Sequence, residues 1–91
     1  MHYTYVLFSL KDKKLYIGST SDWEKRFKRH NSGDVISTRH RRPLKLLFYE
    51  AFLTSQEAKS REVYLKSGAG RKNLYQMLKI TLKKLNYEYL K

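Results

Sequence analysis

Two ionisable side chains stand at helix positions that the sequence pattern predicts to be buried. Glu62 shares an apolar stripe with Ala58 and Leu65, and His30 follows Phe27 on a similar stripe. A buried carboxylate is costly without a partner, so Glu62 needs a base, a metal or a hydrogen-bond donor. A satisfied internal hydrogen bond is the preferred explanation of His30 taken alone. For Glu62 that explanation and a functional role are both open.

Two tyrosines form a second candidate group. Tyr3 and Tyr5 alternate along one apolar run, and Tyr16 and Gly18 alternate along the next. Because alternate residues of a strand share a face, pairing of these strands would bring Tyr5 and Tyr16 onto one surface. Gly18 would leave bare backbone there, open to close approach. Aromatic packing across the strands explains the two tyrosines equally well on their own.

The elements that must position these residues begin with a β-hairpin. Residues Tyr3–Leu10 and Leu15–Thr20 are rich in β-branched and aromatic residues, and the polar segment Lys11–Lys14 predicts a turn between them. A third strand is predicted over Leu44–Phe52, after a basic loop at Gly33–Arg42.

Helices are predicted between and after these strands. A capping box with Ser21 at the cap starts the first helix, which ends at Gly33 and places Arg26 and His30 on one face. Another capping box at Thr54 starts a helix to about Lys66, with Gly68 as its stop. A last basic helix is predicted from Gly70 to about Leu85. The order β-β-α-β-α-α predicts an α+β fold with a small, three-stranded, mostly antiparallel sheet flanked by helices.

Composition limits the class of protein. The 91 residues predict a single domain over 1–91, and the absence of cysteine excludes disulfides and thiolate metal sites. Apolar runs are far too short to span a membrane, and no signal-peptide pattern is present, so we expect a cytoplasmic protein that binds no membrane.

The charge predicts a nucleic-acid partner. Twenty Lys and Arg against eight Asp and Glu give a net charge of +12, spread through folded segments with interleaved aromatics. Residues 25–45 carry eight basic side chains and one acid, Asp34. Such a field attracts polyanions, but charge alone does not separate DNA from RNA.

The ordered motifs resemble the GIY-YIG nuclease superfamily. Tyr16-Ile17-Gly18 stands in the place of the second tripeptide, and Tyr5 lies thirteen residues before Gly18. The segments after it, 19–33 and 57–72, resemble the small stand-alone branch, with similarity to the GIY-YIG nuclease domains of excinucleases and of homing endonucleases. The resemblance covers nearly the whole chain. It rests on an ordered set of residues, namely Tyr5, Tyr16, Gly18, Arg26, His30 and Glu62.

That resemblance implies phosphodiester hydrolysis of DNA with one divalent metal ion, Mg²⁺ or Mn²⁺. Glu62 would be the metal ligand, and Arg26 would hold the scissile phosphate with its planar fork. Tyr5 would act as base or position water, with His30 and Tyr16 assisting proton transfer. An unperturbed tyrosine pKa lies near 10, so Tyr5 needs a cationic neighbour or a metal for this role.

The chain also departs from the family pattern. Tyr3 and Thr4 replace the glycine and isoleucine of the first tripeptide, while Tyr5 is retained. Asn73 is a candidate for an asparagine that often follows the metal-binding glutamate, and an exposed position is the preferred interpretation of His40 and Lys14. Residues proposed to contact nucleic acid are Gly18, Arg29, His40, Arg41, Arg42, Arg71, Lys72 and Asn73.

Three functions follow from these observations. The first is a metal-dependent DNA endonuclease, directed by DNA structure or backbone rather than by base sequence, in repair or recombination. The second is a catalytically weak or silent module that binds DNA or RNA. The third is an interaction protein whose aromatic surface docks another polypeptide; nothing in the sequence excludes this.

Overall fold

The computed structural model describes residues 1–85 and contains three strands and four α-helices. In chain order the elements are β1 (His2–Ser9), β2 (Leu15–Thr20), α1 (Trp23–Ser32), the 3₁₀ helix η1 (Arg39–Arg41), β3 (Leu44–Phe52), α2 (Ser55–Lys66), α3 (Gly68–Met77) and α4 (Lys79–Lys84). This arrangement confirms the predicted α+β fold. The predicted single domain 1–91 includes residues 86–91, which lie outside the described part. No helix among the described residues is long and apolar enough to cross a membrane.

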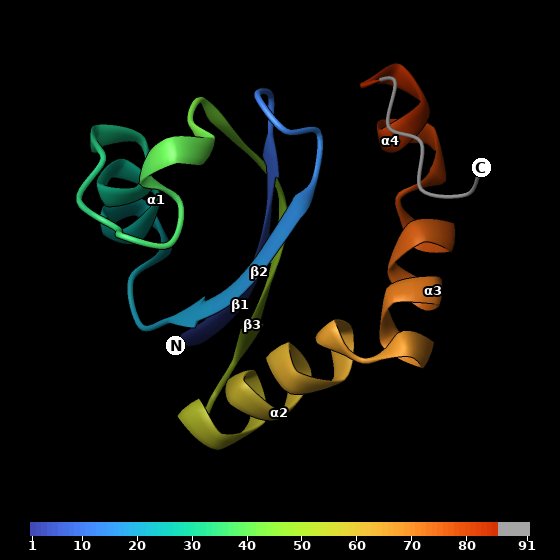
Figure 1. Cartoon of the computed structure of the whole chain (residues 1–91). Helices are drawn as coiled ribbons and strands as arrows, with labels where there is room; N and C mark the ends of the chain where they lie inside the picture. Colours follow the sequence, from blue (N-terminus) through green and yellow to red (C-terminus); the bar gives the residue numbers. More distant parts are fainter. Residues whose placement is uncertain (86–91) are drawn as a thin grey trace.

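The sheet is antiparallel throughout and has the strand order β2-β1-β3. The central strand β1 pairs Tyr5 with Gly18 on one side and with Tyr49 on the other. Because β2 has only one neighbour, its other edge is free of strand pairing. In Figure 1 the helix α1 lies on one side of the sheet, and α3 and α4 lie on the other.

Alternation along β1 creates two cores. Val6 and Phe8 face an apolar cluster built by β2 and the C-terminal helices, with Leu65, Leu74 and Leu82 among its buried members. Tyr5 and Leu7 point to the opposite face, where they pack with Leu44 and the half-buried Tyr16 and Phe27. The α1 face of the sheet is therefore the smaller and more polar of the two.

The cap of α1 differs from the prediction. Asp22, not Ser21, is the N-cap, and its carboxylate accepts a hydrogen bond from the Lys25 backbone nitrogen. Ser21 lies one residue too early for this geometry. The end of the helix is as predicted: Gly33 has φ of +87°, a left-handed conformation that glycine adopts readily.

The C-terminal helices also correct the prediction. The Thr54 cap of α2 is confirmed, since its hydroxyl accepts from the Glu57 nitrogen. Gly68 does not stop α2; Ser67 ends it and also caps α3, which starts at Gly68 rather than Gly70. The predicted last helix is interrupted at Leu78 and forms two helices, α3 and α4. Leu78 and Leu82 can thereby both pack into the larger core.

Candidate active site at the free edge of β2

The candidate site is organised by the close contact between Tyr5 and Gly18. A Cβ atom on Gly18 would lie 2.5 Å from Tyr5 Oη and 2.7 Å from its Cζ. The absence of a side chain at Gly18 therefore lets the Tyr5 ring cross β2 toward the free edge of the sheet. The close approach predicted at Gly18 is real, and the group that approaches is Tyr5.

Helix α1 delivers two nitrogen donors or acceptors to the Tyr5 hydroxyl. Arg26 Nε donates to Tyr5 Oη at 3.3 Å, and His30 Nε2 lies 2.9 Å from the same oxygen. Residues four apart on a helix share a face, which explains why Arg26 and His30 reach one atom. The prediction that these two side chains point the same way is confirmed.

Tyr16 completes an aromatic arrangement around this oxygen. Its ring centroid lies 6.4 Å from that of Tyr5 and 5.1 Å from that of His30. Hydrogen bonding to Tyr5, the largest contribution, raises the pKa of Arg26, and Tyr16 acts in the same direction. The structure thus brings Tyr5, Tyr16, Arg26 and His30 together.

His30 is neutral at physiological pH. Burial, the largest effect, and the cations Arg26 and Arg29 lower the pKa of His30 to about 4. Its side chain is fully buried and bonded at both ring nitrogens, to Tyr5 and to Thr38 Oγ1 at 2.7 Å. The internal hydrogen bond expected of a buried histidine is therefore present, and one partner is a candidate catalytic residue.

The Tyr5 hydroxyl is subject to opposing influences. Burial raises its pKa above 10, and this outweighs the hydrogen bond from Arg26, which lowers it. The negative charges of Tyr16 and Glu62 act with burial. Tyr5 is therefore a phenol at neutral pH in the free protein, and additional positive charge is needed to ionise it.

Glu62 lies on α2, near enough to influence Tyr5 electrostatically. Burial opposes its ionisation, but hydrogen bonds from Lys66 and Ser19 prevail and lower the pKa of the carboxyl. The Lys66 Nζ–Glu62 Oε2 ion pair is 2.7 Å long and partly exposed. The partner that the sequence requires for Glu62 is, in this structure, a lysine four residues along the same helix.

These donors suit a sparsely coordinated divalent cation. No group of three or more His, Cys, Asp or Glu side chains among residues 1–85 forms a metal cluster. Mg²⁺ commonly uses one or two protein carboxylates and takes its other ligands from water and substrate phosphates. The ionised and partly exposed Glu62 fits that pattern, provided that Lys66 moves aside.

Two adjoining hollows mark the surface beside these residues. One, of about 190 Å³, is lined by Asp22, Lys25, Arg26 and Arg29 together with Thr20 and Ser21. The other, of about 100 Å³, shares Thr20 and Ser21 and extends to Ser55 and Lys59 on α2. The surface is therefore hollowed on both sides of the C-terminal end of β2, from α1 to α2.

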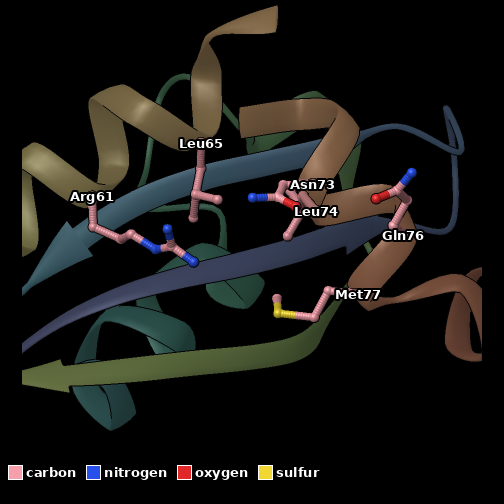
Figure 2. Close-up of a pocket in the computed structure, with 6 residues that line it drawn as sticks. All are labelled: Arg61, Leu65, Asn73, Leu74, Gln76 and Met77. Atoms are coloured by element: carbon pink, nitrogen blue, oxygen red, sulfur yellow. The ribbon is translucent and has the colours of Figure 1, made fainter. Parts of the chain in front are cut away.

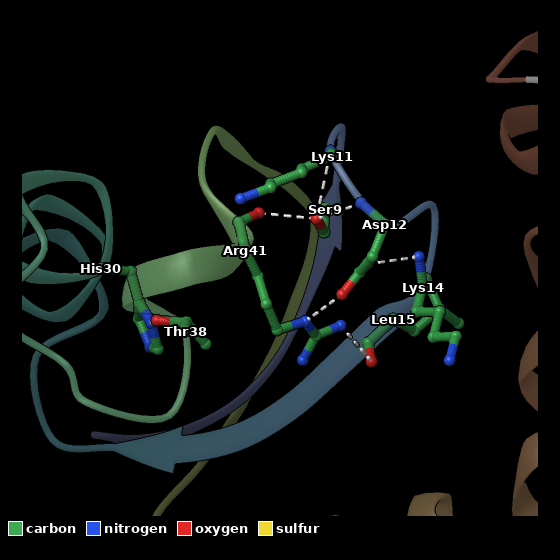
Figure 3. A network of polar contacts seen from close by, with 8 residues as sticks. All are labelled: Ser9, Lys11, Asp12, Lys14, Leu15, His30, Thr38 and Arg41. Atoms are coloured by element: carbon green, nitrogen blue, oxygen red, sulfur yellow. Dashed lines mark hydrogen bonds and ion pairs between the residues drawn. The ribbon is translucent and has the colours of Figure 1, made fainter.

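The basic residues predicted to bind nucleic acid occupy different places. Arg29 lines the larger of these hollows, and His40 is exposed, as the preferred interpretation of its position predicts. Arg41 bonds to Asp12 and to the Leu15 carbonyl, as Figure 3 shows, and so serves the fold. Arg42 donates to the Arg39 carbonyl.

Arg71, Lys72 and Asn73 lie on α3, which packs on the other face of the sheet. Asn73 donates to Tyr64 Oη at 3.0 Å and has no bond to Glu62. Figure 2 shows Asn73 with Arg61, Leu65 and Met77 around a cavity of about 430 Å³ between α2 and α3. None of the five candidate catalytic residues lines this cavity, so the structure does not bring these three residues into the Tyr5 group.

Sequence reasoning missed two polar neighbours of the site, Thr38 and Ser19. Thr38 is fully buried against His30, yet it comes from an irregular loop in which no periodicity could identify it. Ser19 follows Gly18 and faces α2, where it bonds to Glu62. Strand alternation could have placed Ser19 opposite the Tyr5 face, but not next to Glu62.

Comparison with known proteins gives the same class. Residues 1–76 match the model of the GIY-YIG catalytic domain. A UPF0213 protein of Clostridium perfringens is 42% identical over 89 residues, which is 97% of this chain and 95% of that protein. One from Bacillus licheniformis is 48% identical over 73 residues, 79% of this chain and 73% of that protein.

A solved structure agrees with these relatives. The solution NMR structure of the UPF0213 protein BH0048 from Bacillus halodurans has a TM-score of 0.51 and 35% identity, over 84% of this chain and 83% of that one. The chain belongs to the GIY-YIG family. Its relatives are UPF0213 proteins, a stand-alone GIY-YIG group, and its fold is of the nuclease type.

Proposed function

We propose that this chain is a metal-dependent endonuclease that hydrolyses DNA phosphodiester bonds, with residues 1–91 as one nuclease domain. The observation that carries the proposal is the convergence on Tyr5 Oη of Arg26 and His30, beside an ionised Glu62 at a free sheet edge. A phenol, a guanidinium and a carboxylate supply the three functions that phosphate hydrolysis needs: a proton acceptor, a counter-charge and a metal ligand.

Arg26 is proposed to bind the scissile phosphate. Its Nε is used by Tyr5, and no ion pair to an acid holds its terminal nitrogens among the described residues. It lines the basic hollow with Lys25 and Arg29, where a phosphate would meet three cations. A guanidinium suits the planar, two-pronged recognition of phosphate oxygens and would neutralise charge that develops during the reaction.

Tyr5 is proposed to accept the proton of the attacking water. Its phenolate takes one proton as the water oxygen forms a bond to phosphorus and the P–O ester bond breaks; the departing oxygen is protonated by solvent. A divalent ion held by Glu62 would supply the positive charge that ionises Tyr5 and stabilises the phosphate. The Arg26 contact lowers the Tyr5 pKa in the same direction. His30 and Tyr16 assist by holding this oxygen.

Substrate recognition is proposed to depend on backbone and DNA shape. The cations Lys25 and Arg29 have no side-chain partner in residues 1–85, whereas Arg61 and Lys66 on α2 are paired with acids. Phosphate contacts position a protein on DNA but carry no base sequence. A role in DNA repair or recombination in the cytoplasm fits such recognition, and RNA remains an alternative ligand.

One observation favours a second function, a weak or silent nucleic-acid-binding module. The proposed metal ligand Glu62 is occupied by Lys66 at 2.7 Å, and the described residues add no second acid beside it. Such a module would keep the basic surface and bind without cutting, alone or with a protein partner.

Cleavage of a labelled DNA panel separates the two functions. Single strand, duplex, flap, fork and four-way junction are incubated with Mg²⁺, Mn²⁺ or EDTA, using wild type and Glu62→Ala. Metal-dependent cutting by wild type alone supports the nuclease. Salt-sensitive binding by both proteins with no cutting on any substrate supports the silent module.

A further inference from the structure

We propose that Thr38 is a positioning residue: it donates to His30 Nδ1, keeps the single ring proton on Nε2, and so makes His30 a hydrogen-bond donor to Tyr5. The catalytic meaning of this arrangement rests on the function proposed above. The arrangement itself is a property of the folded protein and can be measured without cleavage.

The geometry forms a continuous line of polar contacts. Thr38 Oγ1 lies 2.7 Å from His30 Nδ1, and His30 Nε2 lies 2.9 Å from Tyr5 Oη. Thr38 and His30 are fully buried, and Tyr5 is 3% exposed. Arg26 Nε, which can only donate, meets the same Tyr5 oxygen.

The balance of donors and acceptors decides where the proton lies. His30 is neutral, so one ring nitrogen accepts and the other donates. Among residues 1–85, the Thr38 hydroxyl has His30 Nδ1 as its one hydrogen-bond partner. A proton on Nδ1 would leave the buried Thr38 hydroxyl hydrogen without an acceptor, and such groups are strongly disfavoured. With Nδ1 as the acceptor, both atoms of that contact are satisfied.

The consequence at Tyr5 favours the ionised form. Its oxygen then receives hydrogen bonds from both His30 Nε2 and Arg26 Nε. A phenol in this position has a hydrogen to place, whereas a phenolate has none and accepts both donors. Hydrogen bonds to the charged form lower a pKa. Thr38 thereby acts on Tyr5 through His30, without touching it.

Thr38 is fixed by the loop that carries it. Its backbone nitrogen bonds to the Val35 carbonyl, and its carbonyl accepts from the Arg41 nitrogen. Figure 3 shows how Arg41 ties this segment to the hairpin: its guanidinium bonds to Asp12 at 2.6 Å, and its carbonyl accepts from the Ser9 hydroxyl. The hydroxyl is therefore held against His30 from both sides of η1.

The first experiment determines the His30 tautomer in the wild-type protein. Two-bond ¹H–¹⁵N correlation NMR at pH 7 on histidine-labelled protein distinguishes a protonated ring nitrogen from an unprotonated one. We expect His30 to carry its proton on Nε2, with Nδ1 unprotonated. A proton on Nδ1 would overturn the inference, whatever the protein does to DNA.

The second experiment compares Thr38→Ser with Thr38→Val. Serine keeps the hydroxyl, whereas valine has a similar shape and lacks the donor. We expect Thr38→Ser to retain the wild-type tautomer, and Thr38→Val to populate the Nδ1-protonated form. If both variants keep the wild-type tautomer, Thr38 does not set it. Amide spectra confirm that each variant is folded.

A pH profile of cleavage connects the tautomer to the reaction. The charged and titratable groups facing Tyr5 and His30 are Arg26 and Arg29 from α1, Tyr16 from β2 and Glu62 from α2. In Thr38→Val we expect the midpoint of the rise in activity to move up by about one pH unit, roughly a tenfold loss at neutral pH. Thr38→Ser should follow wild type, and equal midpoints in all three proteins would contradict the inference. A protein with the expected tautomer that cuts nothing would instead refute the nuclease function alone.

Discussion

The two faces of the sheet differ in how they use one central strand. On the α2–α4 face, β1 contributes Val6 and Phe8 to an apolar core that includes Leu65 and Leu74. On the α1 face, it contributes Tyr5, whose neighbours are an arginine, a histidine and a second tyrosine. Period-two alternation therefore separates stabilising residues from candidate chemistry within eight residues of sequence.

The difference shows how a small domain can hold a polar site. Apolar burial on one face supplies much of the stability, while the other face buries hydrogen-bonded groups of small net contribution. Among the described buried side chains, none lacks a hydrogen-bond partner. Substitutions on the two faces should therefore separate stability from activity.

The largest effect is expected from Arg26→Ala on the site face. Loss of the proposed phosphate-binding charge should lower the cleavage rate by about 10²–10³-fold, the range seen when a stabilising donor is removed from an active site. Single-turnover kinetics on the preferred substrate measure this. Lys28→Ala removes an exposed charge from the same helix and should stay within a few-fold of wild type. Equal losses in both variants would indicate a general charge effect instead.

Leu65→Ala on the apolar face should have the opposite profile. Removing this buried side chain should lower the free energy of unfolding by about 2–5 kcal/mol, measured by urea denaturation. Cleavage per folded molecule at low temperature should match wild type. A selective loss of activity with unchanged stability would show that the two faces are not separate in the way described here.

The pH dependence of stability should identify His30. Its folded pKa of about 4 lies below the unfolded value near 6.5, so the folded state binds fewer protons between these values. Stability is then full above pH 6.5 and falls as the pH drops toward 4, by about 2 kcal/mol at pH 5. Asp12 and Glu62, whose pKa values are lowered, contribute mainly below this range. Urea denaturation of His30→Gln should show little slope between pH 7 and 5; a wild-type slope would reassign the effect.

Gly18→Ala should disturb the site through Tyr5. The new Cβ would lie 2.5 Å from Tyr5 Oη, so the ring must move, at a cost of about 1–3 kcal/mol. In a Tyr5→Ala background the same substitution should cost much less. A double-mutant cycle in urea measures the coupling. Additive free energies would mean that Gly18 has some other role.

Regular elements were largely predictable from the sequence, because alternation and capping are local signals. The bounds of β2 and β3 and the Thr54 cap were correct. The start of α1 was shifted because Ser21 and Asp22 are both good caps, and tertiary geometry selected Asp22. The break at Leu78 was missed because it serves packing of two leucines against the sheet, which helix propensity does not encode.

The site was predictable to the extent that it follows those elements. Arg26 and His30 could be placed on one face of α1, and Tyr5 beside Gly18, from periodicity alone. Thr38 could not, because its position depends on an irregular loop held by Arg41 and Asp12. Lys66 as the partner of Glu62 was readable from the i, i+4 spacing, but the choice between lysine and metal depends on what is bound.

Metal-dependent cleavage by Glu62→Gln beside Glu57→Gln tests the central claim most directly. Both substitutions remove one negative charge from α2, and glutamine at 57 can still serve the Thr54 capping box. The proposed function predicts that wild type and Glu57→Gln cut the preferred DNA in Mg²⁺ or Mn²⁺, whereas Glu62→Gln loses cutting and keeps binding. Undiminished cutting by Glu62→Gln, or no cutting by any of the three proteins on any substrate, would contradict it.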